Sequence, residues 1–126
     1  MKILVIEDQP AELKLARHVL RAAGHEVNAI YAAEHACAAI KADRPEIILL
    51  DMVLPGMDGM TLVRMLKADP VTRGINIVAV TSYPEKYTRA EALEAGCDAY
   101  LVKPISTRTL PGELSEVASR GGGDPT

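Results

Sequence analysis

Two kinds of hydrophobic pattern alternate along the chain. The first kind is short, almost wholly apolar and rich in β-branched residues, and it recurs at residues 3–6, 26–31, 47–50, 75–80 and 99–102. Such runs are typical of strands buried on both faces of a parallel sheet. The sequence therefore predicts five strands, of which 47–50 belongs to the most hydrophobic stretch.

Amphipathic segments with helical periodicity separate these runs. In the first, apolar residues recur at intervals of three and four from Leu13 to Ala23, between a Pro10 typical of a helix start and a Gly24 typical of a helix end. Further helices are predicted over residues 33–42, 58–68, 86–95 and 106–119. Pro111 falls early in the last of these, so we expect that helix to start late or to kink.

The order of strand and helix repeats five times, at a spacing of roughly twenty residues, and this predicts an open, doubly wound parallel α/β sheet with helices on both faces. The 126 residues suit a single domain. We expect that domain to span residues 1–119, with residues 120–126 as a flexible tail or the beginning of a linker.

Composition narrows the class of protein. Hydrophobic residues make up 48% and charged residues 25%, which is typical of globular chains, and the absence of Phe and Trp predicts an aliphatic core. The net charge of −3 argues against a nucleic-acid-binding face. No apolar run has the length of a membrane span or signal peptide, so we expect a cytoplasmic protein. Cys37 and Cys97 form no metal-binding pattern and are predicted to be buried free thiols.

Chemically distinctive residues follow four of the five predicted strands. Glu7 and Asp8 follow the first strand, Asp51 the third, Thr81 ends the fourth, and Lys103 follows the fifth. Because parallel strands end at one edge of the sheet, where ligands bind in such folds, these side chains are expected to lie together.

Three carboxylates at one edge repel each other unless a cation lies among them, and oxygen ligands without His or Cys favour Mg²⁺. A metal ion and Lys103 beside Asp51 would suit a phosphoryl group held on that carboxylate. Taken singly, Asp51 could cap a turn and Thr81 could be an ordinary strand residue. Their occurrence together at four strand ends favours a site.

Four segments resemble the CheY-like receiver domain of two-component response regulators. They are VIEDQP (5–10), LLDMVLPGMDGMTLVRML (49–66), AVTS (79–82) and GCDAYLVKPI (96–105), and the match runs in order over about residues 2–118. The resemblance implies a flavodoxin-like sheet with strand order 2-1-3-4-5. It also implies a role in phosphorelay signalling rather than an enzyme.

By this resemblance Asp51 is the phosphoacceptor, which takes a phosphoryl group from a phosphohistidine of a histidine kinase or a histidine phosphotransfer protein. Asp8 would bind Mg²⁺ directly and Glu7 would assist through water. Asp51 and the main-chain carbonyl of Val53 would complete the protein ligands. Lys103, joined to Pro104 by a cis bond, would pair with a phosphoryl oxygen.

The resemblance also implies a conformational switch. Thr81 would move to bind the phosphoryl group, and Tyr100 would turn inward behind it. The surface formed by residues 86–95, 99–102 and 106–119 would then change and regulate a protein partner. We expect a monomer or weak dimer that binds neither nucleic acid nor membrane.

Three alternatives stay open. The chain could be a receiver piece of a longer response regulator or hybrid histidine kinase, although we expect a single-domain receiver. A Mg²⁺-dependent aspartyl phosphohydrolase would need an acid where Val53 stands. A flavodoxin-like cofactor protein is disfavoured by the acidic segment EDQPAE, since a phosphate cradle requires Gly, Ser or Thr.

Overall fold

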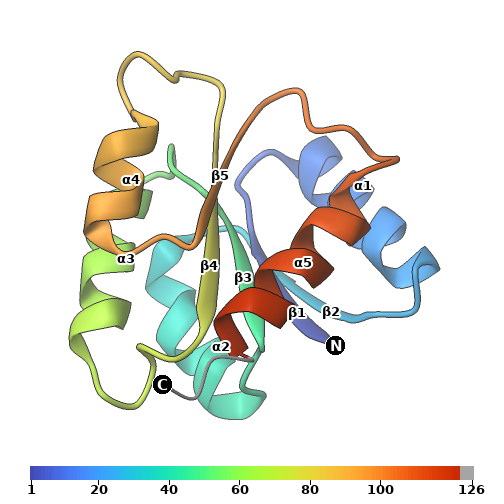
Figure 1. Ribbon diagram of the computed structural model, residues 1–126, viewed down its shortest axis with the longest axis horizontal. Coiled ribbons are helices and arrows are strands. Elements are labelled where there is room, and N and C mark those ends of the chain that lie inside the picture. The colour runs from blue at the N-terminus through green and yellow to red at the C-terminus, as the bar shows by residue number, and fades with distance from the viewer. Residues whose placement is uncertain (123–126) are drawn as a thin grey trace.

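A computed structural model describes residues 1–122 of the chain as one parallel five-stranded sheet with helices on both faces (Figure 1). The strand order is β2-β1-β3-β4-β5, which confirms the predicted fold. In chain order the elements are β1 (Lys2–Ile6), α1 (Pro10–Ala22), β2 (Glu26–Ile30), the 3₁₀ helix η1 (Ala33–His35), α2 (Ala36–Ala42), β3 (Ile47–Asp51), α3 (Gly59–Ala68), β4 (Asn76–Thr81), α4 (Arg89–Ala95), β5 (Ala99–Val102) and α5 (Leu110–Gly122).

Two hydrophobic layers enclose the sheet. Helices α1 and α5 cover one face and α2, α3 and α4 cover the other (Figure 1). Because successive strand residues point to opposite faces, Val5 packs in the layer with Leu20 and Leu114, whereas Leu4 packs in the layer with Leu62. Both faces of the central strands are therefore apolar, as the strand patterns predicted.

The central strand β3 fixes the position of its last residue. All five residues of β3 are buried, and the strand pairs with β1 on one side and β4 on the other. Leu50 is paired with Ile6 of β1, and Asp51 with Val80 of β4. This register places the ends of β1, β3 and β4 side by side at the same edge of the sheet.

The amphipathic pattern at 33–42 divides into η1 and α2, α3 begins one residue late, and α4 and α5 begin well after the first residues of their patterns. Helix α4 begins at Arg89 instead of Lys86, because the Thr88 hydroxyl accepts the Glu91 amide hydrogen and caps the helix. Helix α5 begins at Leu110, which confirms the expected late start and places Pro111 in the first turn, where a missing N–H costs no helical hydrogen bond. The helix continues to Gly122, past the predicted end, and residues 123–126 lie outside the described part of the chain.

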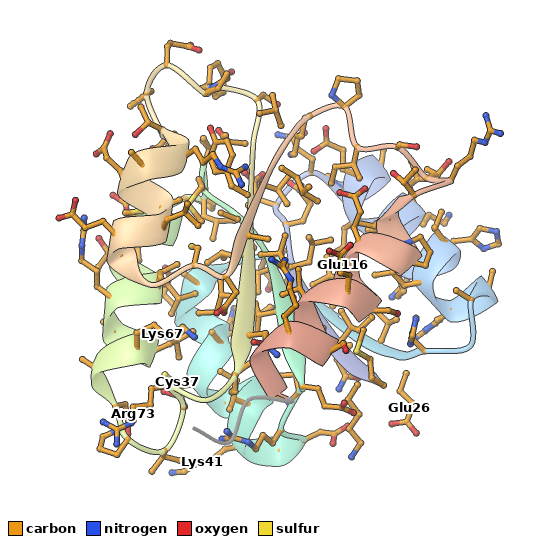
Figure 2. The ribbon with its side chains drawn as sticks, viewed as in Figure 1. Glu26, Cys37, Lys41, Lys67, Arg73 and Glu116 are labelled. Carbon is orange, nitrogen blue, oxygen red and sulfur yellow. The ribbon has the colours of Figure 1, made fainter. Side chains whose placement is uncertain are left out.

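The two cysteines differ in exposure. Cys97 is buried, as predicted, but Cys37, which is labelled in Figure 2, is exposed, so that prediction was wrong for Cys37. The buried positions of α2 are Ala36 and Ile40, one helical turn apart, and Cys37 lies outside their stripe.

Within residues 1–122, none of the helices has the length and hydrophobicity to span a bilayer.

Candidate functional site

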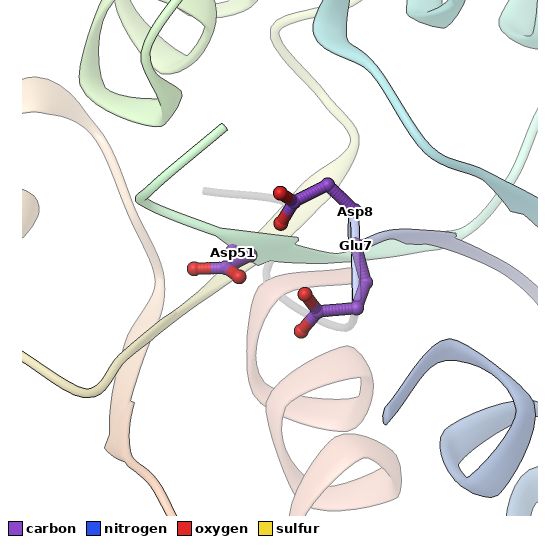
Figure 3. A group of neighbouring side chains, drawn as sticks. All are labelled: Glu7, Asp8 and Asp51. Atoms are coloured by element: carbon purple, nitrogen blue, oxygen red, sulfur yellow. The ribbon is translucent and has the colours of Figure 1, made fainter. Parts of the chain in front are cut away.

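Three carboxylates from two neighbouring strands meet at the carboxyl edge of the sheet. Glu7 and Asp8 follow β1 directly, and Asp51 is the last residue of β3 (Figure 3). One carboxylate oxygen from each residue lies within 4.8 Å of the others. Glu7 and Asp51 are buried and Asp8 is half-buried. The predicted acidic group is therefore assembled, and its all-oxygen donor set fits a hard divalent cation such as Mg²⁺.

Backbone contacts hold the acidic side chains in place. The Gln9 amide donates to Glu7 Oε2 at 3.1 Å, and the Val53 amide donates to Asp51 Oδ1 at 3.0 Å. Gly59, which begins α3, packs closely against the chain that follows β3. A Cβ at this position would lie only 2.7 Å from the Cα of Met52. A glycine is therefore required for α3 to start beside Asp51, a role that the sequence reasoning did not assign.

Lys103 links the acidic residues from the opposite side of the site. It follows β5, its bond to Pro104 is cis as expected, and its side chain is 12% exposed. Its Nζ donates to Glu7 Oε1 at 2.7 Å and to Asp51 Oδ2 at 3.1 Å. It also donates to Glu12 Oε2 at 2.5 Å, and Glu12, in the first turn of α1, was not among the predicted site residues.

The electrostatics of the site follow from burial and crowding. Burial, together with a hydrogen bond to Asp51, raises the pKa of Glu7 to about 8, although Lys103 and the Gln9 amide act in the opposite direction. Burial by itself lowers the pKa of Lys103, but the hydrogen bonds to Glu12, Glu7 and Asp51 outweigh this effect and raise it. Lys103 is thus firmly cationic, and the site holds more negative than positive charge.

Thr81 and Tyr100 lie on the strands next to this cluster. Thr81, fully buried at the end of β4, accepts a hydrogen bond at Oγ1 from the Tyr83 amide at 2.9 Å. Tyr100 on β5 is buried, and its hydroxyl donates to the Tyr87 carbonyl at 2.5 Å. Tyr100 is therefore packed in the core, with its hydroxyl on the segment that precedes α4.

A mostly apolar cavity of about 160 Å³ adjoins the cluster. Strand residues of β1, β3 and β4 form its floor, and α1, α5 and the segment before α5 form its sides. Glu7, Glu12, Asp51 and Lys103 are the charged residues in its lining. The ion pairs of Lys103 therefore lie partly against apolar surface, where water screens them less than in open solvent.

Comparison with known proteins gives the family. Residues 3–115 match the family model described as the response regulator receiver domain. The chain belongs to this family. Its match to the response regulator PleD of Caulobacter vibrioides is 41% identical over 104 residues, 82% of the chain and 23% of PleD. The phosphate regulon transcriptional regulatory protein PhoB of Rhizobium meliloti is 35% identical over 119 residues, 94% of the chain and 52% of PhoB.

Solved receiver structures agree with this assignment. A CheY-like receiver domain protein of Methanospirillum hungatei superimposes with a TM-score of 0.88 at 28% identity, over 97% of this chain and 96% of that one. A response regulator from Chloroflexus aurantiacus gives the same TM-score and identity. The receiver domain described here spans about a quarter of PleD and about half of PhoB.

Proposed function

We propose that this receiver domain accepts a phosphoryl group on Asp51 from a phosphohistidine of a histidine kinase or histidine phosphotransfer protein. The observation that carries the proposal is the environment of Asp51. This residue is 5% exposed at the end of the central strand, with Oδ2 on Lys103 and two further carboxylates beside it. The end of a buried strand thus presents one carboxylate beside the ammonium of Lys103.

The transfer is a displacement at phosphorus. A carboxylate oxygen of Asp51 forms the new P–O bond while the P–N bond of the phosphohistidine breaks, and the imidazole nitrogen keeps the electron pair. Lys103 Nζ donates a hydrogen bond to a phosphoryl oxygen and so stabilises the charge of the transferring group. This requires Lys103 to exchange its contact with Asp51 Oδ2 for one with the phosphoryl group.

The acidic residues would hold Mg²⁺, with Asp8 and Asp51 as direct ligands, Glu7 acting through water and the main-chain carbonyl of Val53 completing the set. The ion, when bound, neutralises negative charge on the transferring oxygens. Support comes from the chemistry of the donors, since Glu7, Asp8 and Asp51 offer only oxygen and crowd together at one point.

Phosphorylation of Asp51 would change the conformations of Thr81 and Tyr100. The Thr81 hydroxyl would leave the Tyr83 amide for a phosphoryl oxygen, and the inward position of Tyr100 would gain population. The surface of α4, β5 and α5 would change with it and regulate a protein partner, or the domain would pass the phosphoryl group on. We propose a signalling role in the cytoplasm, alone or as part of a longer regulator, rather than an enzymatic one.

The test is labelling by a small acyl phosphate such as acetyl phosphate, with and without Mg²⁺, followed by mass measurement of the intact protein. We expect the wild type to gain one phosphoryl group only with Mg²⁺, and Asp51→Asn to gain none. Asp58→Asn is the matched control, because Asp58 is exposed and caps α3, and Asn also caps helices. An unlabelled wild type, or equal labelling of Asp51→Asn, would refute the proposal.

A further inference from the structure

Lys103 has one more carboxylate partner than its proposed task requires. An ammonium has three N–H donors, and here Glu7, Glu12 and Asp51 accept one each. The proposed chemistry uses Glu7 and Asp51. Glu12 is outside the group of carboxylates that can share a metal ion, so its contact with Lys103 calls for another explanation.

The position of Glu12 has an ordinary local cause that does not account for this contact. Pro10 begins α1, and an acidic residue in the first turn interacts favourably with the helix N-terminus. An exposed glutamate would satisfy that preference while pointing into water. Instead Glu12, although 48% exposed, places its carboxylate on the Nζ of a lysine that is 12% exposed and belongs to the far end of the chain.

We propose that Glu12 is a positioning residue that holds Lys103 toward α1 and thereby slows phosphoryl transfer to Asp51. The inference rests on the proposed phosphoacceptor role of Asp51. Lys103 lies closest to Glu12 and Glu7, at 2.5 and 2.7 Å, and farthest from Asp51, at 3.1 Å. While Glu12 occupies one donor, the ammonium is drawn away from the place where the phosphoryl oxygens arrive.

Charge acts in the same direction as the hydrogen bond. Glu12 and Asp51 touch the same nitrogen atom, so their carboxylates lie no farther apart than the sum of those two distances. A phosphoryl donor is itself anionic, and each additional negative charge at this range opposes its approach. The partly apolar lining around Lys103 reduces the screening of this repulsion by water.

The experiment compares initial rates of labelling by acetyl phosphate at saturating Mg²⁺ in the wild type and in Glu12→Gln. We expect Glu12→Gln to react about three- to tenfold faster, because it loses the charge while keeping the side-chain shape and a weaker acceptor. Glu94→Gln on the exposed side of α4 makes the same charge change far from Lys103, and its rate should equal that of the wild type.

A second measurement separates positioning from a merely structural role. Mg²⁺ binding, followed by titration calorimetry, should be a few-fold weaker in Glu12→Gln, because Lys103 is then free to stay on Glu7 and Asp51 and one negative charge is gone. A general disturbance of the fold would instead lower both the rate and the affinity, and thermal unfolding of the variant would reveal it. Glu12→Ala, which also removes the acceptor, should accelerate labelling at least as much.

Faster labelling together with weaker Mg²⁺ binding supports the inference. An unchanged or lower rate in folded Glu12→Gln overturns it, as does a faster rate that accompanies tighter Mg²⁺ binding, because the metal would then account for the effect. Failure of the wild type to be labelled refutes the phosphoacceptor role of Asp51 itself, so the two failures are distinguishable.

Discussion

Two largely buried lysines lie at opposite edges of the same sheet and have different partners. Lys103 follows β5 at the carboxyl edge, whereas Lys67 lies in the last turn of α3 at the amino edge, where Figure 2 shows it above Arg73. Their side chains are 12% and 20% exposed. The same ammonium group is thus buried in two different surroundings.

The partners of Lys67 are two main-chain carbonyls and one carboxylate, so its positive charge is balanced by one negative charge. Its Nζ donates to the carbonyls of Arg73 and Ile75 and, at 3.3 Å, to Asp98 Oδ2. The same oxygen of Asp98 accepts the Ile77 amide at 2.8 Å. The charges of Lys67 and Asp98 balance, and main-chain groups take up their remaining hydrogen bonds. These contacts connect α3 to the beginnings of β4 and β5.

Lys103, in contrast, has only carboxylates as partners, and three of them. The carboxylates around Lys103 therefore carry more negative charge than one ammonium can balance, and a further cation would stabilise them. Around Lys67 one ammonium and one carboxylate balance each other. Burial of a lysine therefore says little about its role, and the charge balance of its partners says more.

The largest expected difference between the two lysines concerns phosphorylation. Lys103→Met should lower the rate of labelling by acetyl phosphate about 100-fold, because the only ammonium of the cluster is lost. Lys67→Met, at the other edge, should change the rate less than about twofold. Intact mass against time gives both rates. A comparable loss in Lys67→Met would contradict the separation of the two edges.

For the free energy of unfolding we expect the reverse order, with a larger loss in Lys67→Met than in Lys103→Met. Lys67→Met leaves Asp98 without its cation and two carbonyls without a donor, so we expect the free energy of unfolding to fall by about 2 kcal/mol. In saturating Mg²⁺, Lys103→Met should cost less than about 1 kcal/mol, because the metal ion offsets the lost charge. Urea unfolding followed by circular dichroism measures both. A larger loss in Lys103→Met than in Lys67→Met would be inconsistent with this comparison.

The acidic edge should also give the protein a pH dependence. The pKa of Glu7 is raised by folding, from about 4.5 to about 8, so the folded state binds more protons than the unfolded state between these values. Stability must then fall as the pH rises through that window. We expect the melting temperature without Mg²⁺ to drop by roughly 10 °C between pH 5 and pH 8, and Mg²⁺ to remove the drop. A flat profile in the metal-free protein would count against this assignment.

The smallest effect concerns the glycine that packs on Lys67. Gly96 has φ of +120°, and a Cβ there would lie 2.6 Å from Lys67 Cγ, whereas Gly24 has φ of +94° with open space around it. Both Ala substitutions incur the cost of a left-handed backbone, about 1 kcal/mol, and Gly96→Ala must also displace Lys67. Thermal unfolding should therefore rank Gly96→Ala below Gly24→Ala. Equal melting temperatures would mean that the Lys67 side chain moves aside freely.

Much of this architecture could be predicted because few physical rules decide it. The apolar runs of β1, β3 and β4 can only be strands buried on both faces, and the strands of a parallel sheet end at one edge. Asp51, Glu7 and Lys103 were therefore placed together from the sequence alone, and the structure agrees. The family match supports the same interpretation.

Other features depend on contacts that periodicity does not encode. The pattern of α1 gives its buried face, but whether Glu12 reaches Lys103, 91 positions later, depends on how α1 packs against β1, β2 and α5. The late start of α4 could have been predicted, because Thr88 and Glu91 have the spacing of a capping box. The apolar and polar residues just before Thr88 also fit helical periodicity, and the helix was therefore predicted to start too early. Cys37 was misplaced because cysteine is buried on average, and its exposure follows from the helical stripe instead.

The burial of Tyr100 has a practical consequence for spectroscopy. The chain contains no Trp and no Phe, so its near-ultraviolet signal comes from four tyrosines. Tyr31 and Tyr83 are more than half exposed, while the ring of Tyr100 is buried with its hydroxyl fixed to a carbonyl. Near-ultraviolet circular dichroism depends on fixed packing around such rings. The unlabelled protein thus carries its own optical reporter at the residue on which the proposed switch depends.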